Sequence, residues 1–399
     1  MDDEYVSGAE AAELLGVTLT TIYAYVSRGR LRSQQLPGSK SHRYWRPDIE
    51  RLRKRERRPK PVAGELRQDS EITLLTERGP YYRGRSAIEL AESASLEAVA
   101  ALLWDADERD VFTVDAPKGS VLVEALCETL ATESGTDRAV ACMCVLEQAN
   151  PRCFDLSRAG MARSGADVVR WLVAIILGKT KASCEPIHVV VGRELGLDED
   201  VTDLIRRILI LSADHGFEQS TYAVRAVSAT GVTPWRAVQT GLAVASGRRS
   251  KFGLSGALRR LMEDITASAD PVGTVVRRIR EEEVLPGFAS AVYPNGDPRA
   301  RALFDYCDRI FANDRSYQRM KRALEAVREL QRLEPSFALA VGFSALQIAD
   351  RSGGRFNQSE TMFPIGRSVG WIAHAIEQYT AGEAAHRDLI YRGPMPIVK

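Results

Sequence analysis

The chain has 399 residues, of which 45% are hydrophobic and 27% are charged. This balance is typical of a soluble globular protein with two or three domains, and it excludes a wholly disordered, collagen-like or coiled-coil chain. The longest strongly apolar stretch, near residues 171–177, is far shorter than the roughly 20 residues that a membrane-spanning helix needs. Six cysteines and an opening Met-Asp-Asp-Glu, which lacks the features of a secretory signal, indicate a cytoplasmic protein with reduced thiols.

The net charge of +1 hides an uneven distribution along the chain. Residues 1–64 hold 13 Lys/Arg against 8 Asp/Glu, a net charge of +5, whereas residues 65–399 hold 41 against 45, a net charge of −4. All 13 of those basic residues lie within 28–60, which favours a polyanion as the partner of the N-terminal part. A solvated basic linker explains the charge alone equally well.

The first elements in chain order are two short helices. Apolar residues at helical spacing predict a helix over 6–15 that stops at Gly16. Thr18 is placed to cap a second helix, which we expect to end at Gly29. On this second helix Ile22, Tyr25 and Val26 share one face, so that face should be buried.

A basic hairpin and a third helix follow. Segments 31–36 and 42–45 are predicted strands joined by Pro-Gly-Ser-Lys, and Pro47-Asp48 should start a helix that continues through Leu52. The Pro-containing, charged segment 56–70 is typical of a hydrated linker. We therefore expect a first domain over residues 1–55.

In "SGAEAAELLGVTLTTIYAYVSRGRL" and "SHRYWRPDIERL" this domain resembles the winged helix-turn-helix of the MerR and excisionase families. The resemblance implies that the second helix enters the major groove of duplex DNA while the hairpin contacts phosphates or the minor groove. The alternative is a small helical module that docks on another protein. The side chains expected to contact DNA are Thr20, Thr21, Tyr23, Arg28, Lys40, His42 and Arg43.

From residue 72 onward the pattern is mainly helical, with clear helical spacing over 122–130, 168–177 and 204–211. Walker, G-x-G-x-x-G, HExxH and G-x-S-x-G motifs are absent. Cysteines 142, 144 and 153 lack the spacing of a zinc pair and lie in an apolar stretch, so we interpret them as core residues and predict no metal site. His215 stands out because "SADHGFEQSTYAVR" places two ionisable residues at the end of an apolar helix.

Several motifs beyond residue 72 resemble the citrate synthase family. They are "ITLLTERGPYYRGRSAIELAESASLEAVAALLW", "VLPGFASAVYPNGDPRARAL" and "FPIGRSVGWIAHAIEQ", in the family's order. The resemblance implies an all-α, two-domain fold over 71–399, with a large domain at 71–220 and 331–399 and a small domain at about 221–330. It also implies a homodimer.

The family condenses acetyl-CoA with oxaloacetate, using an Asp as base, two His that stabilise developing charge, and arginines that hold carboxylates. By motif, the ligand-binding positions are His215, Arg299 and Arg367, and a looser match in "LIYRGPMP" adds Arg392 as the arginine that reaches the partner subunit. The three catalytic positions differ from the family. They hold Leu254 in "KFGLSGAL", Ser290 in "PGFAS" and Ala338 in "EPSFALAVG".

Leu, Ser and Ala cannot replace two imidazoles and a carboxylate, so the resemblance points to a degenerate enzyme. We expect a DNA-binding regulator whose citrate-synthase-like body senses a di- or tricarboxylate, without a tightly bound cofactor and with acetyl-CoA or another acyl-CoA as a further ligand or substrate. Two alternatives stay open. One is an active citrate or 2-methylcitrate synthase, and the other is a silent subunit that pairs with an active citrate synthase paralogue.

Overall fold

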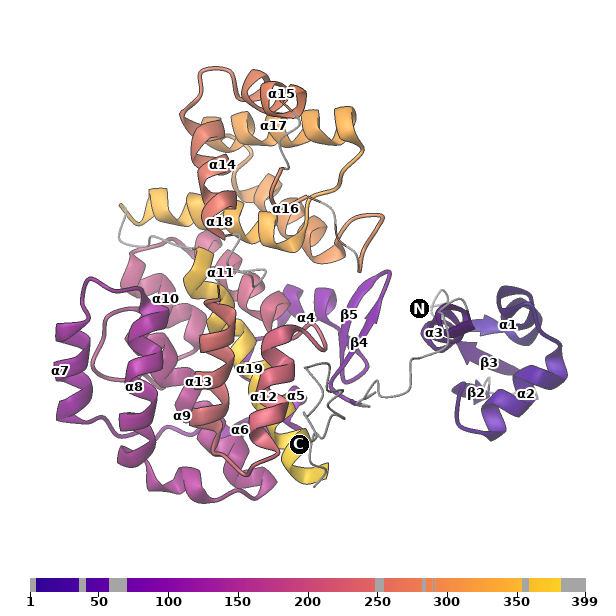
Figure 1. Cartoon of the computed structure of the whole chain (residues 1–399), viewed down its shortest axis with the longest axis horizontal. Coiled ribbons are helices and arrows are strands. Elements are labelled where there is room, and N and C mark those ends of the chain that lie inside the picture. Colours follow the sequence, from indigo (N-terminus) through magenta and orange to yellow (C-terminus); the bar gives the residue numbers. More distant parts are fainter. Residues whose placement is uncertain are drawn as a thin grey trace, which may run out of the picture. The chain divides into compact units, whose positions relative to one another are not determined.

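A computed structural model describes residues 5–35, 41–56, 70–247, 255–281, 285–288, 290, 292–353 and 359–381. The chain divides into two compact units, which among the described residues are 5–56 and 70–381. Each unit is built around its own hydrophobic core. Figure 1 shows their elements.

The N-terminal unit contains three helices and a three-stranded antiparallel sheet of order β1-β3-β2. Its core joins the sheet to the helices through Val6, Ile22, Tyr44 and Ile49, which are almost fully buried. The predicted inner face of the second helix is confirmed, since Tyr25 and Val26 pack against this core beside Ile22. The elements are β1 (Tyr5–Ser7), α1 (Gly8–Leu15), α2 (Leu19–Ser27), β2 (Ser33–Gln35), β3 (His42–Trp45) and α3 (Arg46–Glu56).

The helix boundaries in this unit differ slightly from the predicted ones. The first helix begins at Gly8 because residues 5–7 pair with β3 as a strand and Ser7 caps the helix, forming a capping box with Glu10. The second helix is capped by Thr18 as predicted, but it ends at Ser27, two residues before Gly29. The third helix extends beyond Leu52 to Glu56.

The second unit begins with a small antiparallel sheet of β4 (Thr73–Thr76), β5 (Gly79–Tyr82) and β6 (Arg85–Ser86), and the rest of it is helical. The three predicted helices are confirmed as parts of α7, α9 and α11. The helices are α4 (Ala87–Ser93), α5 (Leu96–Trp104), α6 (Glu108–Val111), α7 (Val121–Thr129), α8 (Gly135–Ala149), α9 (Arg158–Ile176), α10 (Ile187–Leu195), α11 (Glu199–Ser212), α12 (Gln219–Ser228), α13 (Pro234–Ala245), α14 (Ser255–Ala267), α15 (Pro271–Arg280), α16 (Pro298–Ile310), α17 (Arg315–Gln331), α18 (Phe337–Arg351) and α19 (Ser359–Ala381), with a 3-10 turn at Pro151–Phe154.

Two groups of helices can be followed within this unit (Figure 1). In the larger group α19 packs against α5, α9, α11, α12 and α13, and Trp104 of α5 donates a hydrogen bond to the carbonyl of Val369 at 2.9 Å. The smaller group contains α14 to α18, which pack on one another and contact the larger group mainly through α11 and α19. In this packing α12 and α13 lie with the larger group and α18 lies with the smaller one, and the small domain at about 221–330 stays a prediction.

Among the described helices, none combines the length and the hydropathy needed to span a bilayer.

Candidate functional site

The site is assembled where the end of α11 approaches α19. Gly366 and Gly370 lie one turn apart on α19, close to the end of α11. A Cβ at Gly366 would collide with the backbone oxygen of Leu209, and a Cβ at Gly370 with that of Ala213. Glycine at both positions therefore lets α19 lie directly against the end of α11. The consequence is that Arg367, on the same stretch of α19, reaches the loop that carries His215.

His215 and Arg367 are joined through Glu218. The Nδ1 atom of His215 lies 3.3 Å from one carboxylate oxygen of Glu218, and Arg367 Nη1 donates to the other at 2.8 Å. Arg367 Nε donates to the carbonyl of Ser212 at 2.8 Å, and its guanidinium lies over the ring of Phe363. Arg367 is 1% exposed, so its charge is balanced inside the protein rather than by solvent.

The other ring nitrogen of His215 faces Tyr293, whose hydroxyl lies 3.1 Å from Nε2. Burial, reinforced by the nearby charge of Arg299, lowers the pKa of His215 to about 4, so the ring is neutral at pH 7. Burial raises the pKa of the Tyr293 hydroxyl well above its usual value, so it keeps its proton. Because a carboxylate only accepts hydrogen bonds, Nδ1 of the neutral ring donates to Glu218 and Nε2 accepts from Tyr293.

Arg299 reaches the same cluster from the start of α16. Its Nε and Nη2 atoms donate to the two carboxylate oxygens of Asp297 at 3.1 and 2.8 Å. The guanidinium also stacks over Phe337, 4.3 Å from the ring centre, and faces the ring of Tyr293 at 5.8 Å. Both charged partners are buried, with 6% of Arg299 and 4% of Asp297 exposed. The structure thus brings His215, Arg299 and Arg367 into one buried network.

A second buried pair, Asp214 and His374, holds the loop that carries His215. Asp214 Oδ1 lies 3.2 Å from Nε2 of His374 on α19, and Asp214 Oδ2 accepts from the backbone of Gly216 at 3.0 Å. Burial alone would raise the pKa of Asp214, but His374 and Arg367 lower it to about 2. His374 has a structural role in the core, because its ring is 1% exposed and is hydrogen-bonded on both sides, to Asp214 and to Arg225.

Comparison with known proteins places this arrangement in a family. The family model described as "Citrate synthase, C-terminal domain" matches residues 181–392, more than half of the chain. The chain belongs to the citrate synthase family. Citrate synthase 1 of Mycobacterium tuberculosis is 30% identical over 195 residues, which are 47% of this chain and 45% of that protein. Citrate synthase of Haloferax volcanii is 28% identical over 184 residues, 46% of this chain and 48% of that protein.

The chain thus spans about half the length of the curated relatives that it matches. The fold likeness extends further. A solved citrate synthase of the archaeon Thermoplasma acidophilum, in a ternary complex with carboxymethyl coenzyme A and oxaloacetate, superimposes with a TM-score of 0.67 at 17% identity and covers 84% of this chain and 96% of that chain. The mostly helical citrate synthase-like fold predicted for the body is confirmed.

Two of the three positions that the motifs match to the family's catalytic groups are described, and this match stays a prediction. Ser290 uses its hydroxyl locally, accepting from the backbone N–H groups of Val292 and Tyr293 at 3.3 Å each. Ala338 is exposed in the first turn of α18. The third residue, Leu254, lies outside the described residues, as does Arg392. At the described positions neither an imidazole nor a carboxylate is present.

The residues predicted to contact DNA lie on two elements of the N-terminal unit. On α2, Tyr23 is 58% exposed and Thr20 is exposed, whereas the Thr21 hydroxyl lies 3.0 Å from that of the capping Thr18. Arg28, exposed, caps the end of this helix. On β3, His42 is exposed and Arg43 is half-buried, and Lys40 lies outside the described residues.

Sequence reasoning missed three members of the cluster, namely Glu218, Tyr293 and Asp297. The signal for Asp297 was present, because it precedes Arg299 in the D-P-R motif that identified the arginine. No motif or spacing in the sequence marked Tyr293 or Glu218 as a site residue, because only the fold brings them to His215.

The cysteine interpretation is confirmed for Cys142 and Cys153, which are buried in the core, while Cys144 is half-buried beside Gln239. Within the described part of the chain, no group of three or more His, Cys, Asp or Glu side chains is arranged to hold a metal ion.

Proposed function

We propose that this protein is a DNA-binding regulator whose citrate synthase-family body binds a small di- or tricarboxylate without condensing it. The observation that carries the proposal is the contrast between two sets of positions. The cluster of His215, Arg299 and Arg367, predicted to bind the ligand, is assembled and buried, whereas Ser290 and Ala338 occupy the positions that the motifs match to a catalytic imidazole and a catalytic carboxylate.

The cluster is suited to carboxylates because it holds two guanidinium groups in a water-poor environment. Hydrogen bonds among the described residues use two of the three nitrogens of each guanidinium, which leaves Nη1 of Arg299 and Nη2 of Arg367 as donors for a ligand. Asp297 and Glu218 neutralise the arginines before the ligand arrives. A ligand carboxylate would then share each cation or displace its internal partner, and charge-assisted contacts of this kind are strong when they are buried.

Loss of condensation follows from the chemistry of the substituted positions. One missing general acid or base lowers a rate by about 10²–10⁴, and one missing donor to a developing oxyanion by about 10²–10³. Such losses do not simply multiply, but when every group is lost only substrate binding remains. Under this proposal an acyl-CoA is at most a second ligand and is not turned over. Citrate synthesis would then require an active paralogue.

In the proposed regulator the N-terminal unit binds DNA. Its helix, turn, helix and basic hairpin follow the order found in winged helix-turn-helix proteins, with the exposed side of α2 facing solvent. A homodimer of the body would present two such units to a pseudo-palindromic DNA site, which is the symmetry that dimeric regulators use. We place this regulator in the cytoplasm.

Titration calorimetry of the full chain with oxaloacetate and with citrate tests the binding proposal. We expect saturable binding, and we expect Arg299→Lys and Arg367→Lys to weaken it at least tenfold, because an ammonium cannot reproduce the fork of a guanidinium. Arg309→Lys, at an exposed position on α16, is the matched control and should bind like wild type. If neither acid binds, or if both cluster variants bind like the control, the cluster is an internal ion-pair network and the silent-subunit alternative is the better one.

A further inference from the structure

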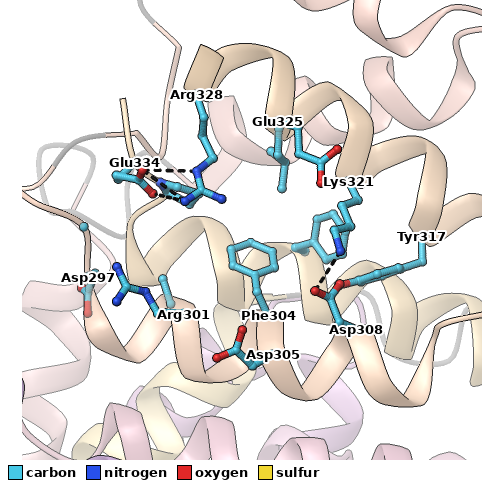
Figure 2. Close-up of a pocket in the computed structure, with 15 residues that line it drawn as sticks. Asp297, Arg301, Phe304, Asp305, Asp308, Tyr317, Lys321, Glu325, Arg328 and Glu334 are labelled. Atoms are coloured by element: carbon cyan, nitrogen blue, oxygen red, sulfur yellow. Dashed lines mark hydrogen bonds and ion pairs between the residues drawn. The ribbon is translucent and has the colours of Figure 1, made fainter. Parts of the chain in front are cut away.

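A separate cavity of about 130 Å³ opens between α16 and α17 (Figure 2). Its floor is aromatic. Phe343 of α18 packs edge-on against Phe304 and Tyr317, with ring centres 5.4 and 5.1 Å apart. The cavity shares only Asp297 with the cluster described above, since His215, Tyr293, Arg299 and Arg367 do not line it. It is therefore a different site from the proposed carboxylate site.

Two ion pairs fix the ends of the cavity. Lys321 of α17 donates to Asp308 of α16 at 2.9 Å, and Arg328 of α17 lies 2.9 Å from a carboxylate oxygen of Glu334 (Figure 2). These pairs connect α17 to its neighbours on opposite sides of Phe304. Because these four charges neutralise one another, we expect the two pairs to hold the cavity open rather than to bind a charged ligand.

The remaining charged residues that line the cavity are Asp297, which is paired with Arg299, and Arg301, Asp305 and Glu325, the last three of which are exposed. Within the part of the chain that the structure describes, none of the three forms an ion pair. Arg301 and Asp305 lie one turn apart on α16, and Glu325 projects from α17 on the other side of the cavity, near Lys321 (Figure 2). The rim therefore offers one guanidinium and two carboxylates around an aromatic floor.

We propose that this cavity is a binding site for a free basic amino acid, for which L-arginine is the probe. Its α-carboxylate matches Arg301, its α-ammonium and guanidinium match the carboxylates of Asp305 and Glu325, and a planar guanidinium or its methylene stem can lie on Phe304. The ligand's net charge of +1 balances the net −1 of the three rim residues. The proposal does not depend on the proposed function, because Arg301, Asp305, Glu325 and Phe304 lie outside the His215 cluster and Asp297, the one residue that lines both, is given no contact with the ligand.

The test is titration calorimetry of the full chain with three ligands of nearly equal size. L-Arginine carries all three charges, agmatine lacks the carboxylate, and L-citrulline replaces the guanidinium by a neutral urea group. For a ligand of this size in a half-open site we expect L-arginine to bind with a Kd of about 1 mM or tighter. Agmatine and L-citrulline should each bind at least about fivefold more weakly.

Variants of the rim assign the binding to this cavity. Glu325→Gln should weaken L-arginine binding about fivefold, the equivalent of ~1 kcal/mol, and should leave L-citrulline binding unchanged. Arg301→Gln should weaken L-arginine but not agmatine. Glu281→Gln, an exposed position at the end of α15 that does not line the cavity, is the control. The proposal is overturned if L-arginine does not bind at millimolar concentration, if L-citrulline binds equally well, or if Glu325→Gln and Glu281→Gln give the same affinity.

Discussion

Asp297 holds Arg299 by both carboxylate oxygens, although only one residue separates them in the chain. The aspartate also accepts from the backbone N–H of Arg299 at 3.0 Å, so it caps α16 and positions the arginine at the same time. The first turn of the helix thereby presents a buried cation whose charge is already compensated. A ligand carboxylate that approaches Arg299 meets a preorganised donor rather than a flexible surface side chain.

Removing the charge of Asp297 is expected to lower the free energy of unfolding, because Arg299 then stays buried without a counter-charge. In Asp297→Asn the guanidinium stays buried without its counter-charge, and breaking a buried pair in this way lowers the free energy of unfolding by about 3 kcal/mol. Saturating oxaloacetate should recover part of this loss by supplying a carboxylate. Urea denaturation with and without oxaloacetate measures both effects. Asp115→Asn, at an exposed position, is the control and should change stability by less than about 0.5 kcal/mol.

His215 predicts a pH dependence of stability. Its pKa is about 4 in the folded protein, against an ordinary value of 6.5 that applies to the unfolded chain, so between these values the unfolded chain binds the extra proton. The contribution of the neutral ring is fully present above pH 6.5 and is lost as the pH falls toward 4, by up to about 3 kcal/mol. Denaturation curves at pH 7 and pH 4.5 for wild type and His215→Gln measure it. Equal pH dependence in the two proteins would contradict the assigned environment of His215.

The close approach of α19 to α11 depends on Gly370. In Gly370→Ala the new Cβ meets the carbonyl of Ala213 and the side chain of Asp214, which are backbone and a buried charged group that cannot easily move. Overpacking of this kind costs about 1–3 kcal/mol and outweighs the ~1 kcal/mol that alanine gains in a helix. The same shift should displace His215 and weaken oxaloacetate binding. A variant as stable as wild type, with unchanged affinity, would show that the contact does not position the site.

The N-terminal unit should bind duplex DNA with an affinity that falls steeply as salt rises, because phosphate contacts release counterions. Arg43→Ala should weaken binding to every sequence, whereas Tyr23→Ala should reduce discrimination between sequences. Fluorescence anisotropy of labelled duplexes at several salt concentrations separates these effects. Glu13→Gln, an exposed position on α1, is the control. Failure of the full chain to bind any duplex at low salt would remove the DNA-binding half of the proposal.

Local signals explain which parts of the structure could be predicted from sequence. The Thr18 cap and the apolar spacing of α2 act within one turn, so they placed that helix correctly at its start. The position of Arg299 followed from its motif. The contacts of Glu218 with both His215 and Arg367 could not be predicted in this way, because the glutamate and the arginine lie 149 residues apart and meet only through the packing of α19 on α11. Helical spacing also does not reveal which group of helices a given helix joins, so the small domain at about 221–330 stays a prediction.

The central claim is that this citrate synthase-family body has lost condensation while it keeps a carboxylate site. The most direct measurement is the release of free thiol from acetyl-CoA by the full chain in the presence of oxaloacetate, with propionyl-CoA assayed in parallel. We predict no release above the rate without protein, under conditions in which calorimetry shows oxaloacetate bound. Oxaloacetate-dependent turnover in the usual enzyme range of about 1–10³ per second would contradict the account and identify the protein as an active synthase.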